Sequence, residues 1–378
     1  MGRDSRSVDS VDTFPKLLLE NARKFSARPA VREKDLGIWQ SWSWSEMKDE
    51  IAAMAAGLKS FGFERGDSLA IVGDNRPQLY WAMTAAQALG GKPVPMYQDA
   101  VAEEMQYVLE HAEVKYAIVE DQEQTDKLLE VMDRCPFLKE IIHKDERGMR
   151  HYDQPFVRSL ADLMDAGRKF LSETPGWFEA EAAKGSGADI AIMLYTSGTT
   201  GRAKGVMLSF DNLIKTARNG VEWDNLNERD EVLAYLPMAW VGDNIFSYSQ
   251  SYVAGFCVSC PESADTVMTD LKEIGPTYFF APPRIFETIL TQVAIRMEDA
   301  SWLNRALYKF FMAHADRIGP DLLDGKSVGI IDRLIYALGE VLIYGPLKNE
   351  LGFSRFRLAY TAGEAIGPDI FDFYRGIG

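Results

Sequence analysis

Residues 195–205 read Tyr-Thr-Ser-Gly-Thr-Thr-Gly-Arg-Ala-Lys-Gly. The segment follows an apolar stretch, Ile190–Leu194, and precedes another, Val206–Leu208, so we expect a loop between two strands. Its glycines let the backbone turn N–H groups toward a ligand, and its hydroxyl groups can donate further hydrogen bonds. The lysine near its end supplies a mobile positive charge. Together these features predict a loop that binds phosphate groups.

The predicted phosphate-binding residues are Thr196, Ser197, Gly198, Thr199, Thr200, Gly201 and Lys204. The loop is not a Walker A loop, which requires G-x-x-x-x-G-K-[ST], because alanine occupies position 203, five residues after Gly198. The alternative interpretation is a flexible linker rich in serine, threonine and glycine. A linker would need neither the two flanking strands nor this arrangement of glycine and lysine.

Outside the loop, short apolar runs alternate with helical patterns. Strands are expected at Leu69–Val72, Tyr116–Val119, Glu140–Ile142, Ile190–Tyr195, Val206–Leu208, Val232–Leu236, Phe256–Ser259, Thr277–Phe280 and Arg357–Thr361. Helices are expected at Phe14–Phe25, from the capping box Ser43-x-x-Glu46 to Leu58, and at Pro77–Leu89, Glu103–His111, Gln124–Asp133, Ile285–Ile318, Ile330–Lys348 and Pro368–Arg375. This alternation predicts an α/β fold of stacked subdomains with mostly parallel sheets flanked by helices. The stretch His143–Gly187 is less regular and is interpreted as a connecting region.

Composition limits the classes of function. The 378 residues suffice for two or three domains, and the formal net charge of −15 argues against general binding of nucleic acids. It also disfavours an anionic membrane surface unless a local basic patch overrides it, so peripheral membrane contact stays open. Cys257 and Cys260 form one C-x-x-C without further ligands nearby, so a buried strand is favoured over a zinc site, and no metal ligand is predicted. Neither a signal peptide nor a transmembrane segment is expected, and the predicted location is cytoplasmic; the oligomeric state is not predicted.

The pattern Tyr-Thr-Ser-Gly-Thr-Thr-Gly-x-x-Lys-Gly at 195–205 resembles the signature of the AMP-forming adenylating enzymes, which include acyl-CoA synthetases, luciferases and peptide-synthetase adenylation domains. The resemblance extends from about Thr13 to the end of the chain. Leu236–Trp240 is similar to a second family motif that lines the acyl site, and Tyr360–Ala365 is similar to the segment that contacts adenine. The helical stretch from about Met297 to Leu351 resembles long-chain fatty acyl-CoA synthetases; an ordinary helical cover on a sheet is the alternative.

The resemblance implies a ligase that uses ATP, Mg²⁺ and coenzyme A. A fatty carboxylate attacks the α-phosphate of ATP to give acyl-AMP, and the coenzyme A thiol then displaces AMP. Gly363, Glu364 and Ala365 would bind adenine, and Trp240 and Asn244 would bind the acyl group. Many long-chain members carry histidine where this chain has Trp240, which leaves the acyl preference open.

The resemblance also implies a domain organisation. We expect a flexible tail at 1–12, a first α/β subdomain at 13–213 ending with the phosphate loop, and a partial second subdomain at 214–378 with a helical insert at about 297–351. The family's aromatic-Gly-x-Thr-Glu motif, ribose-binding aspartate and catalytic-lysine domain do not occur in this sequence. We therefore expect the N-terminal part of a longer ligase, inactive by itself and with no complete catalytic set. The alternatives are a non-catalytic nucleotide- or acyl-binding module of the same fold and an unrelated phosphate-binding protein.

Overall fold

A computed structural model describes residues 11–196 and 202–378 of the chain. The chain divides into two units, of which the first ends at Ala264 and the second runs Asp265–Gly378. Most of the predicted tail and five of the predicted phosphate-binding residues lie outside the described residues: Ser197, Gly198, Thr199, Thr200 and Gly201.

A five-stranded parallel sheet forms the centre of the first unit, in the order β4-β3-β5-β6-β7. Its strands are β3 (Ser68–Val72), β4 (Lys92–Met96), β5 (Val114–Val119), β6 (Glu140–His143) and β7 (Val157–Ser159). The sequence analysis missed β4 because it contains Pro93 and Pro95. Proline cannot donate to a strand ladder, and β4 tolerates two prolines because it ends the strand order of this sheet.

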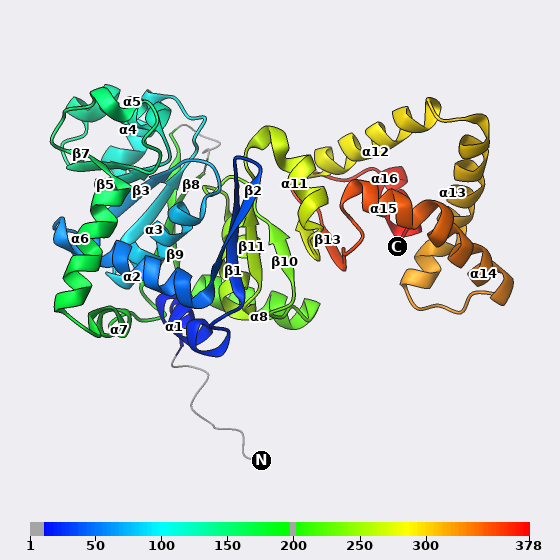
Figure 1. The fold of residues 1–378 in the computed structure, drawn as a ribbon, viewed down its shortest axis with the longest axis horizontal. Helices are drawn as coiled ribbons and strands as arrows, with labels where there is room; N and C mark the ends of the chain where they lie inside the picture. The colour runs from blue at the N-terminus through cyan, green and yellow to red at the C-terminus, as the bar shows by residue number, and fades with distance from the viewer. Residues whose placement is uncertain (1–10, 197–201) are drawn as a thin grey trace, which may run out of the picture. The chain divides into compact units, whose positions relative to one another are not determined.

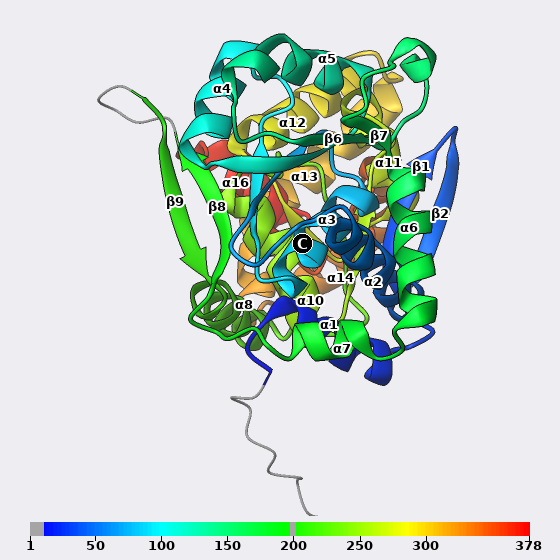
Figure 2. The ribbon, with the colours of Figure 1, turned by 90° about the vertical axis from the view of Figure 1, so that its left-hand side faces the viewer.

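Helices cover both faces of this sheet (Figure 2). One face packs against α4 (Ala102–His111) and α5 (Gln122–Val131). Val72, Met105 and Leu128 form part of that core and are fully buried. The other face packs against α3 (Pro77–Ala88) and α6 (Leu160–Glu173), and α2 (Trp44–Ser60) packs on these two helices. This layered arrangement confirms the predicted α/β fold.

The helix α6 lies in the stretch that the sequence analysis interpreted as irregular, so that interpretation was wrong for residues 160–173. Two glycines explain how α6 packs so closely on α2. A Cβ atom at Gly167 would lie 1.8 Å from the carbonyl oxygen of Ala53, and one at Gly57 would lie 2.2 Å from the carbonyl oxygen of Leu163. Glycine in α6 therefore marks backbone-to-backbone contact between two helices, although it also lowers helix propensity.

Four further strands of the first unit lie side by side in the order β10-β11-β1-β2 (Figure 1). They are β1 (Pro29–Asp35), β2 (Ile38–Ser43), β10 (Glu231–Leu233) and β11 (Cys257–Cys260). The hairpin of β1 and β2 is antiparallel and was not predicted, because charged residues interrupt its hydrophobic pattern. Cys257 and Cys260 are buried and free, as predicted for a buried strand.

The remaining elements of the first unit are α1 (Phe14–Lys24), α7 (Trp177–Ala182), β8 (Ile190–Thr196), β9 (Lys204–Ser209), α8 (Phe210–Asp224), α9 (Val241–Asp243), a π-helical turn (Asn244–Ser249) and α10 (Gln250–Ala254). The capping box predicted at the start of α2 is confirmed, since Ser43 and Glu46 bond reciprocally. The predicted boundary between the two subdomains, at residues 213 and 214, falls inside the continuous helix α8. Along the chain, the boundary between the two units of the structure falls between Ala264 and Asp265.

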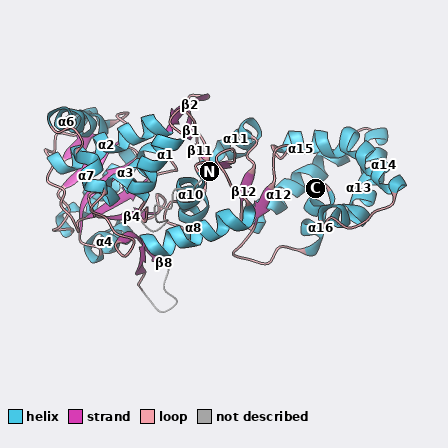
Figure 3. Cartoon of the chain, turned by 90° about the horizontal axis from the view of Figure 1, so that it is seen from below, coloured by secondary structure: helices cyan, strands magenta, loops and turns pink. Residues whose placement is uncertain are grey.

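The second unit is mainly helical (Figure 3). Its two strands, β12 (Tyr278–Phe280) and β13 (Leu358–Tyr360), pair in parallel. Its helices are α11 (Val267–Ile274), α12 (Pro283–Glu298), α13 (Trp302–Leu323), α14 (Ile330–Gly339), a π-helical turn (Glu340–Tyr344), α15 (Gly345–Leu351) and α16 (Pro368–Gly376). The helical stretch predicted at Ile285–Ile318 is confirmed and consists of two helices, because the chain breaks after α12 and Ser301 caps the start of α13.

Candidate functional site

The segment singled out by the sequence connects the two strands of an antiparallel hairpin, β8 and β9. Thr196, the last residue of β8, pairs in register with Lys204, the first residue of β9. Both side chains are exposed, so both are accessible to a ligand. The prediction of two flanking strands is confirmed, and pairing of β8 with β9 fixes where the segment begins and ends.

A cavity of about 630 Å³ adjoins both flanks of this segment. Its wall includes Thr196 and Arg202 from the flanks, Tyr97 after β4, Tyr107 of α4, and Ala239. Ala239 belongs to the Leu236–Trp240 segment that the sequence analysis proposed for acyl binding. One cavity in the first unit is therefore lined by both the predicted phosphate segment and the predicted acyl segment.

Trp240 is 40% exposed, and its indole lies near enough to the Tyr97 phenol to affect the pKa of that phenol. Burial raises the pKa of the Tyr97 phenol, so the phenol remains neutral at physiological pH. A large, partly exposed apolar face next to Ala239 of the cavity wall is compatible with the predicted acyl contact.

Two buried amide groups hold the backbone of the acyl segment. Asn244 Nδ2 donates to the carbonyl oxygens of Met238 and Trp240, each at 2.8 Å. Asn75 Nδ2, from the loop after β3, donates to the carbonyl oxygen of Leu236 at 2.9 Å. The carbonyl oxygens of alternate residues in this segment thus each accept a hydrogen bond from an asparagine side chain. In this structure Asn244 orders the acyl segment, and its contact with an acyl group stays a prediction.

A carboxyl group is buried directly beside these amides. Asp243 is 1% exposed, and its two oxygens accept hydrogen bonds from the Tyr80 phenol at 3.0 and 2.9 Å. Asn75 Nδ2 also approaches one of them, at 3.3 Å. Burial raises the pKa of Asp243 to about 7, against hydrogen bonds from Tyr80 and Ser247 that favour the charged form. Sequence reasoning missed this residue because nothing in its local pattern marks it as buried.

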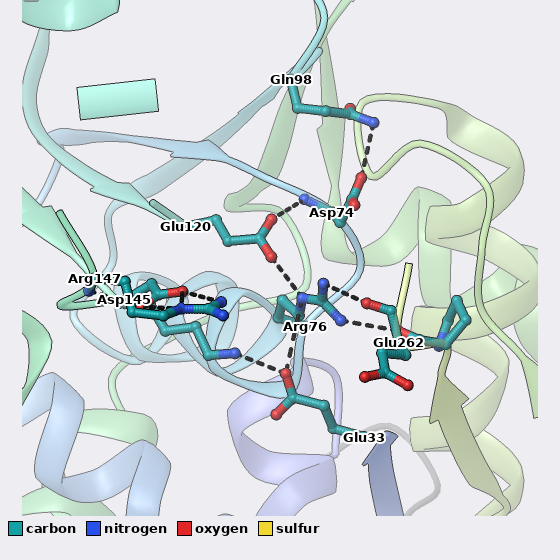
Figure 4. Close-up of polar contacts among 10 residues, drawn as sticks. Glu33, Asp74, Arg76, Gln98, Glu120, Asp145, Arg147 and Glu262 are labelled. Atoms are coloured by element: carbon teal, nitrogen blue, oxygen red, sulfur yellow. Dashed lines mark hydrogen bonds and ion pairs between the residues drawn. The ribbon is translucent and has the colours of Figure 1, made fainter. Parts of the chain in front are cut away.

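A charged network connects β1 with residues that follow the strands β3, β5, β6 and β11 (Figure 4). Arg76, after β3, donates to Glu120 after β5 at 2.6 Å and to the carbonyl oxygens of Pro261 and Glu262 after β11, both at 2.8 Å. Glu33 of β1 lies 3.8 Å from Arg76 and accepts from Lys144 at 2.7 Å.

The same network extends to the backbone next to the predicted sites. The Glu120 carboxylate accepts from the N–H of Asp74 at 2.6 Å, and Asp74 accepts from Gln98 at 3.0 Å. Burial and the neighbouring Glu120 raise the pKa of Asp74. The members come from separate segments, so no spacing in the sequence could reveal them. They fix the loop that carries Asn75 and thereby the acyl segment.

The predicted adenine-binding residues lie in the second unit, after β13. Gly363, Glu364 and Ala365 are exposed, and Gly363 has a left-handed φ of 101° with nothing within 4 Å of its Cβ position. A cavity of about 310 Å³ begins beside them, lined by Tyr360, Thr361, Ile366 and further aromatic residues. An open backbone next to an aromatic cavity is compatible with main-chain contacts to a planar base.

Among residues 11–196 and 202–378, no three histidine, cysteine, aspartate or glutamate side chains come together as a metal site. Within that part of the chain, no helix has the length and apolar character needed to cross a bilayer.

Comparison with known proteins identifies the same family as the sequence motifs. Residues 18–378 match the protein family described as AMP-binding enzyme. The long-chain-fatty-acid–CoA ligase ACSBG2 of Rattus norvegicus is 26% identical over 371 residues, covering 96% of this chain and 54% of its own length. The long-chain-fatty-acid–CoA ligase heimdall of Drosophila melanogaster is 25% identical over 375 residues, covering 97% and 55%. The chain therefore spans about half the length of these curated relatives.

Solved structures show the same fold at lower identity. The adenylation domain of a carboxylate reductase from Mycobacterium chelonae superposes with a TM-score of 0.68 at 18% identity, over 97% of this chain and 56% of that one. The N-terminal domain of FACL13 from Mycobacterium tuberculosis gives a TM-score of 0.63 at 19% identity, over 96% and 72%. At these identities the likeness establishes the fold.

Proposed function

Because the chain belongs to the family of AMP-binding enzymes, we propose that it carries the nucleotide- and acyl-binding part of a ligase that activates a long-chain fatty acid with ATP. The observation that carries the proposal is the shared cavity of the first unit. Thr196 and Arg202 beside the phosphate segment and Ala239 of the acyl segment line one space, so a carboxylate and a polyphosphate would meet there. The similarity to long-chain-fatty-acid–CoA ligases supports the choice of acid.

The reaction must overcome repulsion between a carboxylate and a polyphosphate. In the proposed first step, a carboxylate oxygen attacks the α-phosphorus, the bond from that phosphorus to the bridging oxygen breaks, and pyrophosphate leaves. Positioned N–H and O–H donors and a cation stabilise the charge as it develops. We assign this role to Thr196 and Lys204, together with Ser197, Gly198, Thr199, Thr200 and Gly201.

The remaining roles are assigned by resemblance. Gly363, Glu364 and Ala365 of the second unit would contact adenine, and Trp240 would contact the acyl chain. In the second step the thiol of coenzyme A attacks the acyl carbonyl carbon and AMP leaves. Mg²⁺ would enter with ATP as part of that substrate.

The test measures nucleotide binding by this chain. ATP should bind more tightly than GTP, and Lys204→Ala should weaken ATP binding about 10- to 150-fold, because a charge-assisted bond contributes about 1.5–3 kcal/mol. Lys215→Ala is the matched control, since Lys215 is an exposed lysine of α8 paired with Asp211. Equal affinity for ATP and GTP would favour an unrelated phosphate-binding protein. Unchanged ATP affinity in Lys204→Ala would overturn the proposed phosphate site.

A further inference from the structure

One helix contacts the chain on both sides of the phosphate segment. Tyr107 of α4 donates its phenol O–H to the carbonyl oxygen of Ala203 at 2.9 Å. His111, one turn further along α4, has its Nδ1 atom 2.7 Å from the phenol oxygen of Tyr195. Tyr195 and Ala203 lie on the two sides of residues 197–201. The two hydrogen bonds therefore fix both flanks to the same rigid element.

The rings of these residues also support one another. Tyr107 and His111 stack with centroids 5.5 Å apart, and Tyr195 meets His111 edge-on at 5.7 Å and Tyr107 at 6.4 Å. The Arg202 guanidinium lies over the Tyr107 ring, 5.5 Å from its centroid. Residues at i and i+4 share a helix face, so α4 presents Tyr107 and His111 together toward the hairpin.

The cluster adds a constraint that the hairpin itself lacks. Pairing of Thr196 with Lys204 sets the distance between the strands, and β8 lies against β4 with Tyr195 in the core of the sheet. The hydrogen bonds from Tyr107 and His111 add directional contacts to α4, which packs on the five-stranded sheet through Met105 and Leu109. Fixing a binding segment before the ligand arrives lowers the entropy lost on binding.

We propose that Tyr107 and His111 are positioning residues, which hold the two flanks of residues 197–201 so that Thr196 and Lys204 on those flanks are placed for the ATP phosphates. The proposal rests on the proposed function, because it concerns the same nucleotide site. It predicts that removing the hydrogen bonds weakens the binding of phosphates specifically, rather than destabilising the fold.

The experiment uses the full chain and two ligands, ATP and adenosine. Tyr107→Phe removes the hydroxyl and keeps the ring, and His111→Ala removes the second contact. Each should weaken ATP binding about 2- to 10-fold, which is the range expected for one neutral hydrogen bond. Adenosine affinity should stay unchanged, since adenosine has no phosphates. Combining Tyr107→Phe with Lys204→Ala should weaken ATP binding by less than the product of the single effects.

Tyr116→Phe is the matched control. Tyr116 of β5 makes the same kind of bond, from its phenol to the carbonyl oxygen of Phe61 at 3.0 Å, and it takes no part in the cluster. Equal weakening of ATP binding in Tyr116→Phe would mean general destabilisation and would overturn the proposal. Unchanged ATP affinity in Tyr107→Phe and His111→Ala, with a weakened Lys204→Ala, would overturn the positioning role and leave the proposed function standing. A wild-type chain that binds adenosine as tightly as ATP would overturn the proposed phosphate site itself.

Discussion

The phenol of Tyr80 donates to both carboxyl oxygens of Asp243, at 3.0 and 2.9 Å, in a site that water does not reach. Tyr80 belongs to α3, and Asp243 immediately precedes Asn244, which fixes the acyl segment. Among the described residues, no cation forms an ion pair with Asp243. The carboxyl group is therefore stabilised by hydrogen bonds alone. Because no cation favours its charged form, the effect of burial on its pKa outweighs that of the hydrogen bonds.

The first prediction concerns the pH dependence of stability. An ordinary aspartate pKa is about 3.9, whereas burial raises that of Asp243 to about 7. Between these values the folded protein keeps a proton that the unfolded chain releases. The contribution of Asp243 to the free energy of unfolding therefore falls by up to about 1.4 kcal/mol per pH unit as the pH rises from about 4 to 7. In urea denaturation, the free energy of unfolding of the wild type should therefore decrease relative to that of Asp243→Asn as the pH rises over this range.

The groups around Asp243 define the control. Tyr80 from α3 and Cys260 from β11 face it, and burial raises the pKa of each well above its ordinary value, so both stay neutral across this range. Asp165→Asn changes an exposed carboxylate on α6 and should give no such trend. A stability difference between wild type and Asp243→Asn that is constant from pH 5 to 8 would show that Asp243 ionises like a surface group.

The second prediction concerns Arg76, whose side chain is 11% exposed. Arg76→Met keeps much of the side-chain volume but removes the 2.6 Å partner of Glu120 and the hydrogen bonds that Arg76 donates to the carbonyl oxygens of Pro261 and Glu262. Breaking a buried ion pair costs about 3–5 kcal/mol. Chemical denaturation should show a loss of this order for Arg76→Met. Arg168→Met breaks an exposed pair with Glu50 and should cost less than about 1 kcal/mol. Equal losses in both variants would mean that the network adds nothing to stability.

The comparison of sequence with structure shows which features local patterns can reveal. The phosphate segment was identified because its residues are contiguous and its flanks are apolar strands. The capping box of Ser43 and Glu46 was identified for the same reason. Arg76, Glu120 and Glu33 meet only after three segments fold together, so their sequence neighbourhoods carry no signal. Strand β1 has a weak hydrophobic pattern because it carries several charged residues. In the folded protein these charges form ion pairs, such as that of Glu33 with Lys144.

Residue function is harder to predict than residue position. The resemblance assigns Asn244 to the acyl site, and in the structure its amide donates to the carbonyl oxygens of Met238 and Trp240. Tyr107 and His111 read as ordinary helix residues, and only the folded hairpin brings Tyr195 and Ala203 to them. Long-range contacts of this kind require the tertiary structure.

The third prediction concerns the contact between α2 and α6. Gly167→Ala would place a methyl group 1.8 Å from the carbonyl oxygen of Ala53, so the helices must separate. Overpacking of this kind costs about 1–3 kcal/mol, and it outweighs the gain in helix propensity of about 1 kcal/mol. Thermal melting should show a lower Tm for Gly167→Ala. At Gly367 an added Cβ would meet only Ile370 Cδ1 at 3.7 Å, so Gly367→Ala should change the Tm much less. A Tm of Gly167→Ala at or above that of the wild type would contradict the close packing.

The last prediction concerns Trp240 and the acyl chain. Trp240 offers a partly exposed apolar face beside the cavity, so it should contact a long acyl chain more than a short one. Trp240→Ala should weaken the binding of a hexadecanoyl sulfamoyl-adenosine about 10- to 150-fold, since burial of a large apolar side chain contributes about 1.5–3 kcal/mol. Binding of the butanoyl analogue should change less than about twofold, and Trp240→Phe should lie between wild type and Trp240→Ala for the longer ligand. Trp223→Ala removes a tryptophan of α8 that is 83% exposed and should leave both affinities unchanged. Equal losses for the two ligands in Trp240→Ala would mean that Trp240 supports the adenylate rather than the chain, and the acyl site would then have to lie elsewhere.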